Sequence, residues 1–435
     1  MKQAYLFLIA ILLASCNAIK DNDRQSSLKS QIQSDSTLSI VKNKAIDLVK
    51  SGFTAGDGYS EVWIRDYNTF ITLASTVHNP ETTKENLRVF FRLQGQDGNI
   101  VDGFIPKEKA KQTTGGYQYI FTELEPANAG HKNTVETDQE SSLIQAVYKY
   151  IRATGDEAFL QESIGGTTVA KRLEAALDFL MEHRFSEEYG LLWGATTADW
   201  GDVQPEHIWG VYLDENSHLA IDIYDNAMFL VAIDNFLELS PDRSSKWEEI
   251  RNDIAANAMK HLWDAERQKF KPHIYLDGSP FPADLNEDEI YYHGGTAIAI
   301  EANLLSKEQV KASFDRMIEN VRNANAPSVG LTLYPPYPAG SFQNKSMSPY
   351  DYQNGGDWTW FGGRIIKQMI RNGFYQQAYE QIRPMLDRVI VHDGFYEYYS
   401  RDNKPSGSGS FRGSAGVLYD AILLLEAYAE VDQEK

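Results

Sequence analysis

The chain has 435 residues and carries 41 Lys and Arg against 61 Asp and Glu, which gives a formal net charge of −20 at pH 7. This acidic balance argues against nucleic acid or an anionic membrane surface as a partner, because both would repel the protein. A content of 42% hydrophobic and 12% aromatic residues is that of a globular protein with a sizeable core, and it excludes the disordered class.

The N-terminus has the form of a bacterial lipoprotein signal. Lys2 precedes a short apolar run, and Leu13-Ala14-Ser15-Cys16 contains the only cysteine at the expected cleavage point. We therefore expect residues 1–16 to be a signal peptide with lipidated Cys16, so that only this lipid holds the protein to the outer or cytoplasmic membrane, on the periplasmic or cell-surface side. Residues 17–36 are polar and predict a flexible tether. Residues 37–435 are expected to form one catalytic domain.

Twelve segments of this domain have apolar residues at three- and four-residue spacing, and no series of alternating strand patterns competes with them. The predicted helices cover about 37–51, 66–78, 81–95, 136–153, 166–183, 219–237, 241–263, 293–303, 307–320, 357–371, 374–388 and 413–430. Odd members, such as 241–263, have a charged face suited to solvent, whereas even members are more apolar. Every even member opens on a cluster of acids, aromatics and glycines. This alternation predicts an all-α fold, an (α/α)6 toroid of six helical hairpins whose parallel inner helices begin at one end, around a cleft formed by long loops.

The first cluster is Trp63-Ile64-Arg65-Asp66. An Arg beside a carboxylate can bind sugar hydroxyls by charge-assisted hydrogen bonds, while Trp63 and Tyr59 offer aromatic faces to a sugar ring. Asp66 could instead simply cap the helix that follows.

The second cluster runs from residue 136 to residue 140. Thr137 with Glu140 three residues later has the pattern of a capping box, which is a purely structural alternative. Glu136, Asp138 and Gln139 exceed the needs of a cap, so we interpret them as candidate ligands of sugar hydroxyls.

The loop at residues 192–206 contains the strongest candidates for a general acid. Asp199 and Asp202 are three residues apart beside Trp200, with glycines that let the backbone approach a ligand. A partly desolvated carboxyl group in this setting would keep its proton near neutral pH. A tight turn with an Asp cap is the structural alternative.

Two later clusters complete the candidate site. Asp357, Trp358 and Trp360 open the helix predicted at 357–371, and these tryptophans suit the apolar faces of sugar rings. Glu397 lies among four aromatic residues, which favours a catalytic base, although it could pair with Arg401 or Arg412.

In these residues the chain resembles the six-hairpin glycosidases, the group that includes glucoamylase, trehalase, processing α-glucosidase, the debranching-type glucosidases and cellobiose phosphorylase. Trp63-Ile64-Arg65-Asp66 is similar to the Arg-Asp motif that holds the terminal sugar in glucoamylases and debranching-type enzymes. Residues 198–202 resemble the cellobiose phosphorylase motif whose last Asp is the general acid, which implies Asp202. Alignment to the processing-glucosidase motif implies Asp199 instead.

The resemblance extends to the general base. Glu397-Tyr398-Tyr399 is similar to the trehalase and processing-glucosidase segment in which the Glu is the base. Residues 355–363 depart from the corresponding family segment, because Asp357 stands where that pattern carries Arg-Gly-Pro.

We therefore predict a glycoside hydrolase, inverting and exo-acting on a neutral oligosaccharide or glucan-like glycan, with Asp202 or Asp199 as acid and Glu397 as base. The expected partner is carbohydrate, with no nucleic acid, and a monomer is expected. No cofactor and no metal is expected, because the chain lacks zinc-ligand spacing and a phosphate-binding glycine loop. The alternatives are a glycan phosphorylase on the same fold and a non-catalytic, lipid-tethered glycan-binding protein.

Overall fold

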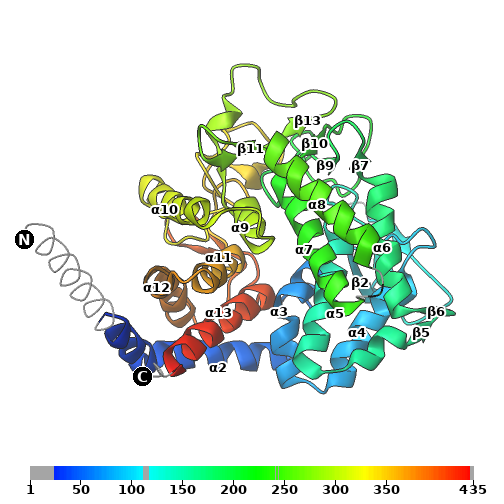
Figure 1. Cartoon of the computed structure of the whole chain (residues 1–435), viewed down its shortest axis with the longest axis horizontal. Coiled ribbons are helices and arrows are strands. Elements are labelled where there is room, and N and C mark those ends of the chain that lie inside the picture. The colour runs from blue at the N-terminus through cyan, green and yellow to red at the C-terminus, as the bar shows by residue number, and fades with distance from the viewer. Residues whose placement is uncertain (1–23, 111–116, 241, 243, 432–435) are drawn as a thin grey trace, which may run out of the picture.

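The computed structural model of the chain describes residues 24–110, 117–240, 242 and 244–431. The predicted signal peptide with Cys16 and the first residues of the predicted tether lie outside this part. Within it, helices α2 to α13 alternate between an inner and an outer ring (Figure 1). The inner helices are α3 (Ile64–Val77), α5 (Gln139–Thr154), α7 (Ile223–Leu239), α9 (His293–Glu301), α11 (Thr359–Arg371) and α13 (Arg412–Glu430). The outer helices are α2 (Ser36–Lys50), α4 (Pro80–Leu93), α6 (Val169–His183), α8 (Ser244–His261), α10 (Lys307–Ala324) and α12 (Tyr375–Val391).

The inner ring is closed. Each inner helix packs against the next one in the chain, and α13 packs back against α3. Each outer helix packs on a neighbouring inner helix, as α4 does on α5, α8 on α7 and α12 on α11. This is the predicted (α/α)6 toroid of six helical hairpins, and all twelve predicted helices are confirmed with boundaries shifted by a few residues.

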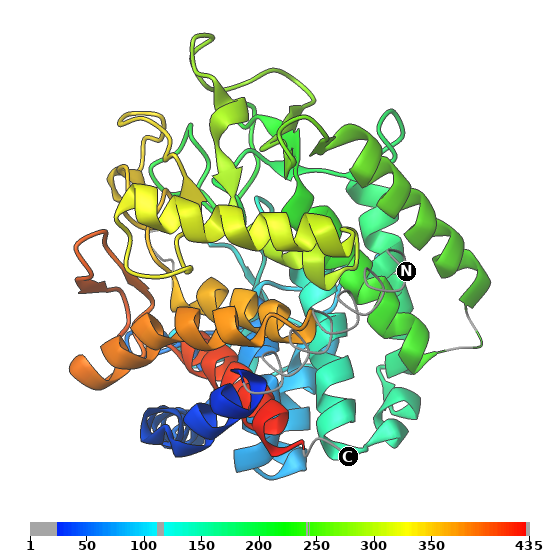
Figure 2. The ribbon, with the colours of Figure 1, turned by 60° about the vertical axis from the view of Figure 1, so that its left-hand side comes forward.

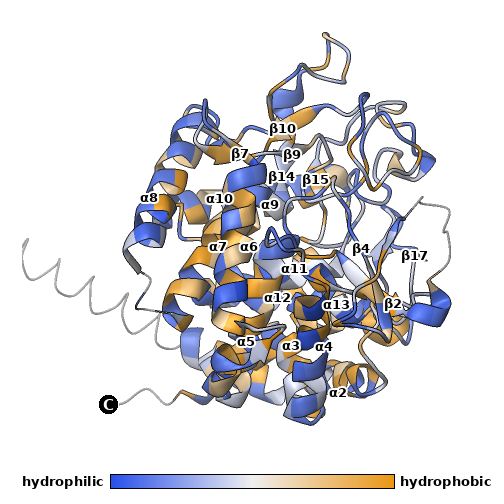
Figure 3. Cartoon of the chain, turned by 90° about the vertical axis from the view of Figure 1, so that its right-hand side faces the viewer, coloured by the Kyte–Doolittle hydropathy of each residue, from blue (hydrophilic) through white to orange (hydrophobic). Residues whose placement is uncertain are grey.

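Small residues let the inner helices approach one another closely. A Cβ atom on Gly416 of α13 would lie 2.4 Å from the Cα of Phe70 in α3, and one on Gly363 of α11 would lie 2.6 Å from Cγ2 of Val417. The inner helices are buried on almost every side, so α9 has only apolar, small or hydrogen-bonded residues from His293 to Ile300. Figure 3 shows this contrast, with hydrophobic colour in the interior and hydrophilic residues on the outer turns of α8.

Short strands brace the loops at the end where the inner helices begin. One sheet has the order β1-β2-β4-β3 and another the order β13-β10-β9, with antiparallel pairing throughout. Their strands are β1 (Val62–Trp63), β2 (Gly103–Pro106), β4 (Asn128–His131), β3 (Tyr119–Ile120), β13 (Ile274–Tyr275), β10 (Leu219–Ile221) and β9 (Gly194–Ala195). Antiparallel two-stranded pairs are β5 (Ser163–Ile164) with β6 (Thr167–Thr168), β7 (Phe185–Ser186) with β8 (Leu191–Leu192), β11 (Trp263–Asp264) with β12 (Lys269–Phe270), β14 (Tyr291–Tyr292) with β15 (Leu333–Tyr334), and β16 (Tyr398–Tyr399) with β17 (Pro405–Ser406). Strands this short depend on tertiary pairing, which explains why no sequence pattern predicts them.

The described part of the predicted tether is folded. Residues 24–34 form a helix, drawn in dark blue in Figure 2, that lies against α13. Leu28 and Ile32, four residues apart on one face, are only 4% and 3% exposed, and this apolar contact is why the prediction of a flexible tether is wrong for this stretch. None of the described helices has the length and apolar content needed to cross a membrane.

Candidate active site

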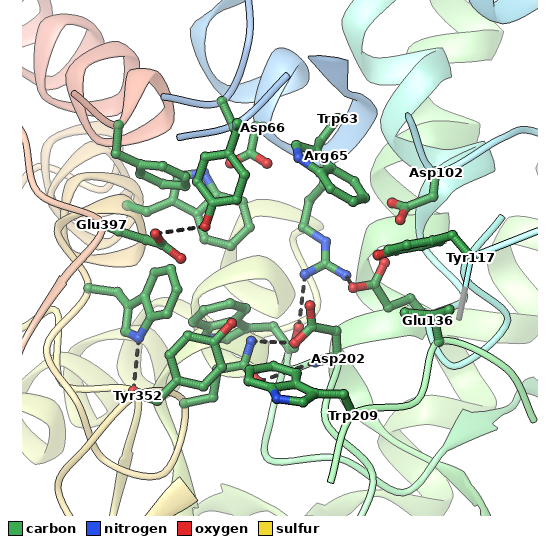
Figure 4. A pocket seen from close by; sticks show the side chains of 18 of the residues that line it. Trp63, Arg65, Asp66, Asp102, Tyr117, Glu136, Asp202, Trp209, Tyr352 and Glu397 are labelled. Carbon is green, nitrogen blue, oxygen red and sulfur yellow. Dashed lines mark hydrogen bonds and ion pairs between the residues drawn. The ribbon is translucent and has the colours of Figure 1, made fainter. Parts of the chain in front are cut away.

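A cavity of about 410 Å³ lies at the end of the toroid where the inner helices begin (Figure 4). Its walls come from the starts of α3, α11 and α13, from the segment just before α5, and from the long loops between the helices. The lining residues are Ala55, Tyr59, Trp63, Arg65, Asp66, Asp102, Tyr117, Glu136, Trp200, Asp202, Trp209, Gly210, Val211, Tyr352, Gln353, Trp358, Trp360, Glu397 and Phe411. The predicted convergence of helix starts therefore produces a cavity, which is lined by the first residues of α3 and α11 or by residues just before α5 and α13.

Three tryptophans form a rigid aromatic wall. Trp200 makes edge-on contacts with Trp358 and Trp360, with ring centroids 4.8 and 5.0 Å apart. The indole of Trp358 donates to the carbonyl of Tyr352 at 2.9 Å, and that of Trp360 donates to Thr69 Oγ1 at 2.9 Å. Because packing and hydrogen bonds fix these rings, they offer a preformed apolar surface of the kind that binds sugar rings.

Arg65 is held by carboxylates from the segment before α5. Its guanidinium pairs with Glu136 and, through Nε, with Asp138 Oδ2 at 2.8 Å. Tyr224 of α7 donates to the same Asp138 oxygen at 2.7 Å. Asp138 is fully buried behind the cavity and orients Arg65, whose Nη1 donates to the carbonyl of Trp200 at 3.4 Å.

Asp202 and Glu397 face this cavity from two different loops. Asp202, on loop 184–222, accepts a hydrogen bond at Oδ1 from Gln353 Nε2 at 2.7 Å, and its backbone N–H donates to Gln353 Oε1 at 3.3 Å. Glu397, on loop 392–411, accepts at Oε2 from the Tyr59 hydroxyl at 2.9 Å and from the backbone N–H of Ser408 at 3.1 Å. Both carboxyl groups are thus oriented by neighbours and exposed to the cavity.

Burial changes the acidity of the carboxyl groups here. It raises the pKa of Glu397, although the hydrogen bonds from Ser408 and Tyr59 oppose this shift, and the nearby charge of Asp202 adds to it. Burial also raises the pKa of Asp66 to about 7, with Arg65 opposing and Glu397 adding to the shift. A cavity in which burial raises the pKa of more than one carboxyl group is suited to acid–base chemistry.

Asp199 does not line this cavity. Its carboxylate accepts hydrogen bonds from the backbone N–H groups of Gly294 at 2.6 Å and Gly295 at 2.7 Å, at the start of α9. Its backbone has a left-handed φ of 56°. The structure therefore separates the two candidate acids, with Asp202 lining the cavity and Asp199 hydrogen-bonded to the start of α9.

Three other predicted sugar ligands also lie outside the cavity. Asp357 is paired with Arg388 at 2.6 Å and accepts from Ser328, so a buried ion pair uses its charge. Asp138 supports Arg65 from behind. Gln139 accepts from Lys132 at 2.7 Å and donates to Glu136, which makes it a support for the cavity wall. The capping box considered for Thr137 and Glu140 does not form, since Thr137 donates to the carbonyl of Trp193 and Glu140 pairs with Lys132.

Several lining residues are absent from the predicted set. Asp102 and Tyr117 come from loop 94–138, and Tyr352 and Gln353 come from loop 325–358. No cluster of acids and tryptophans marks these positions in the sequence, and only the length of their loops indicated that they could reach the cavity. Among the described residues, no group of His, Cys, Asp and Glu is arranged to hold a metal ion.

Comparison with protein-family models gives one match, in which the catalytic domain of the glycosyl hydrolase 94 superfamily covers residues 24–398. No curated protein matches the sequence.

Solved structures with this fold include glycosidases. A GH63 mannosylglycerate hydrolase from Thermus thermophilus, in complex with glucose, superposes with a TM-score of 0.63 at 15% identity over 87% of this chain and 99% of that one. A rhamnosidase from Klebsiella oxytoca with rhamnose bound has a TM-score of 0.56 at 13% identity, covering 89% of this chain and 63% of that one. A GH78 rhamnosidase from a Bacillus species has a TM-score of 0.51 at 15% identity, covering 89% and 34%. At such identities the likeness shows the fold alone.

Proposed function

The chain belongs to the glycosyl hydrolase 94 superfamily through its catalytic domain, and from this premise we propose that it is an inverting glycoside hydrolase acting on the end of a neutral oligosaccharide or glucan-like glycan. The observation that carries the proposal is the meeting of Asp202 and Glu397, from two distant loops, in one cavity walled by tryptophans.

The two carboxyl groups have distinct environments that suit distinct roles. Glu397 accepts two hydrogen bonds at one oxygen, which favours its ionised form and suits a base that deprotonates water. Asp202 is held toward the cavity by the amide of Gln353, and the resemblance of residues 198–202 to the phosphorylase motif assigns it the proton that passes to the glycosidic oxygen. Protonation of the leaving oxygen by Asp202, together with attack by water activated by Glu397 on the opposite face of the sugar, inverts the anomeric carbon.

The charge of the cavity favours water over phosphate as the second substrate. The described lining residues include the carboxyl groups of Asp66, Asp102, Glu136, Asp202 and Glu397. Arg65 is the single basic side chain among them, and it is already paired with two carboxylates. Even with Asp66 and Asp102 protonated, the remaining carboxyl groups outnumber the single guanidinium, so a phosphate dianion would meet net repulsion here, whereas water and neutral sugars would not.

A glycan phosphorylase is the second candidate, because residues 198–202 resemble the phosphorylase motif and the acid role of Asp202 would be the same in both reactions. The two reactions differ in whether phosphate is consumed and in the need for Glu397.

The test is a proton NMR assay of the protein lacking residues 1–20 with α- and β-linked oligosaccharides, with and without phosphate. Hydrolysis predicts release of a sugar of opposite anomeric configuration without phosphate. Glu397→Gln should lower kcat by roughly 10²- to 10⁴-fold. Asp202→Asn should lose activity on oligosaccharides by a similar factor but retain much more on aryl glycosides, whose leaving group needs little protonation.

Asp214→Asn is the matched control, because this exposed carboxylate lies on the same loop as Asp202 and pairs with His207 outside the cavity. Release only with phosphate would assign the protein to the phosphorylases. Sugar binding without any turnover would favour the glycan-binding protein.

A further inference from the structure

Asp102 is a carboxyl group in the cavity that the proposed acid–base pair does not use. It directly precedes β2, and its backbone is fixed on both sides: its N–H donates to the carbonyl of His131 at 2.9 Å, and its carbonyl accepts from the N–H of Ile64 at 2.9 Å. The side chain lines the cavity and is only 4% exposed. Figure 4 shows it beside Tyr117, on the side of Arg65 away from Glu397.

No counter-charge neutralises Asp102 among the residues that the structure describes. Its nearest basic neighbour is His131, whose Nδ1 lies 3.9 Å from Asp102 Oδ2, beyond hydrogen-bonding distance. His131 is buried against the rings of Trp63 and Tyr117, with centroids 4.6 and 4.5 Å away, and burial lowers its pKa to about 3. His131 is therefore neutral at neutral pH and provides no charge for an ion pair.

The cations farther away are engaged elsewhere. Arg65 is paired with Glu136 and Asp138. Lys132 donates to the carbonyl of Ile100 and to the side chains of Gln139 and Glu140. The titratable and charged groups that face Asp102 from the elements around it are Arg65 of α3, His131 and Lys132 at the end of β4, Glu136 and Asp138 before α5, Tyr117 of loop 94–138 and Asp202 of loop 184–222.

This environment keeps a proton on Asp102 at neutral pH. Burial raises the pKa of Asp102 to about 8, with Arg65 and Lys132 opposing the shift and Asp138 and Asp202 adding to it. Among the described residues, none forms a hydrogen bond with its carboxyl group, so an O–H donor faces the cavity without a protein partner. A sugar hydroxyl placed in the cavity beside this group would accept its hydrogen bond.

We infer that Asp102 binds substrate as a neutral carboxylic acid, donating a hydrogen bond to a sugar hydroxyl on the Trp63 and Tyr117 side of the cavity, and that it selects neutral sugars over uronic acids. The inference rests on the proposed function for the identity of its ligand as a sugar. A uronate placed here would bring a further negative charge beside the carboxyl groups of Glu136 and Asp202, which a neutral sugar does not. The aromatic rings beside Asp102 offer apolar contact to the same sugar unit.

The test measures sugar binding by isothermal titration, which needs no turnover. The probes are glucose, mannose, galactose and rhamnose, with glucuronate and galacturonate as anionic counterparts. At pH 7, Asp102→Asn keeps a donor of the same shape, so the affinity for the neutral sugar should stay within about threefold of the wild type. Asp102→Ala removes the donor and should weaken binding on the order of 10- to 100-fold. Uronates should bind the wild type more weakly than neutral sugars.

The pH dependence gives a second readout. Wild-type affinity should fall as pH rises through about 8, because the donor is lost when Asp102 ionises, and Asp102→Asn should not show this fall. A fall that persists in Asp102→Asn would belong to another group and would overturn the inference. Three further results would overturn the inference: equal sugar affinity of Asp102→Ala and the wild type, equal loss of affinity in Asp102→Asn and Asp102→Ala, or no sugar binding by the wild type.

The two proposals can fail separately. If the expected binding pattern appears in a protein that cleaves no glycoside, the proposed hydrolysis fails and the role of Asp102 stands. If glycosides are cleaved while Asp102→Ala binds and reacts normally, hydrolysis stands and the role of Asp102 fails. Thermal unfolding of each variant checks that the fold is retained.

Discussion

Tyr59 and the backbone N–H of Ser408 both donate to one oxygen of Glu397, which leaves the other oxygen to face the cavity. This arrangement fixes the carboxylate and opposes the effect of burial on its pKa. A base in an apolar cavity without such donors would hold its proton too tightly to accept another from water at neutral pH. Tyr59 therefore controls the protonation of Glu397 without contacting the bond that breaks.

Replacing Tyr59 by Phe tests this control. One donor to the carboxylate is removed, so the pKa of Glu397 should rise further. The base must be ionised, so activity is lost as pH falls through this pKa, and the acid limb of kcat/KM should move to higher pH by up to about one unit. The measurement is the pH–rate profile of Tyr59→Phe and of the wild type.

Tyr396→Phe is the matched control, since Tyr396 is next to Glu397 in the chain but does not line the cavity. An unchanged acid limb in Tyr59→Phe, or a shift to lower pH, would contradict the assignment of Glu397 as the base that this limb reports.

Residue type, together with position near a helix start or on a long loop, was enough to predict many of the cavity residues, including Trp63, Arg65, Asp202 and Glu397. The direction of each side chain could not be predicted. Asp199 and Asp202 lie three residues apart on one loop, yet the carboxylate of Asp199 accepts from the start of α9, and its backbone is left-handed. The sequence did not predict Asp102 as a site residue, because its burial and its lack of a counter-charge arise from segments that are distant in the chain.

At the scale of elements, periodicity predicted every helix from α2 to α13, with errors at both ends, and two errors at helix starts have a clear physical cause. The helix predicted at 219–237 begins at Ile223, because residues 219–221 pair with β9 and β13 as strand β10. The helix predicted at 136–153 begins at Gln139, because the preceding residues bind Arg65 and Trp193. In both cases contacts with distant segments override a local pattern that would otherwise extend the helix.

The start of α9 depends on Asp199, and this dependence predicts how a variant behaves. Asp199→Ala leaves the buried N–H groups of Gly294 and Gly295 without acceptors. It also puts alanine at position 199, where the φ of 56° is less favourable for alanine than for aspartate. The free energy of unfolding should fall by roughly 2 to 5 kcal/mol. Asp199→Asn tolerates the left-handed backbone and keeps one acceptor, so it should lose less. Urea or thermal unfolding measures both variants.

Activity per folded molecule then separates the two candidate acids. The folded fraction of Asp199→Ala should retain activity, whereas Asp202→Asn should be folded and inactive on oligosaccharides. A stable but inactive Asp199→Ala, together with an active Asp202→Asn, would exchange the roles of the two residues.

For the molecule as a whole, residues 24–35 connect the beginning of the domain to its end. Gln33 donates to the carbonyl of Ala429 at 2.9 Å, at the end of α13, and Asp35 caps α2 while it pairs with Arg383 of α12. The family match also begins at residue 24. The domain therefore starts before the predicted boundary at residue 37, and composition alone did not reveal this because most residues of the first helix are exposed and polar.

Burial of Leu28 and Ile32 gives this helix a measurable share of the stability of the domain. Replacing both by Ala removes most of two buried apolar side chains. Each contributes about 1.5 to 3 kcal/mol to the free energy of unfolding, so unfolding should occur at a clearly lower temperature. Gln31→Ala, an exposed position on the same helix, is the control and should unfold with the wild type. Neither Leu28 nor Ile32 lines the cavity, so kcat below the unfolding transition should be unchanged in the double variant. Unfolding temperatures equal to the wild type would mean that the helix is only loosely attached in solution and that the segment is a tether after all.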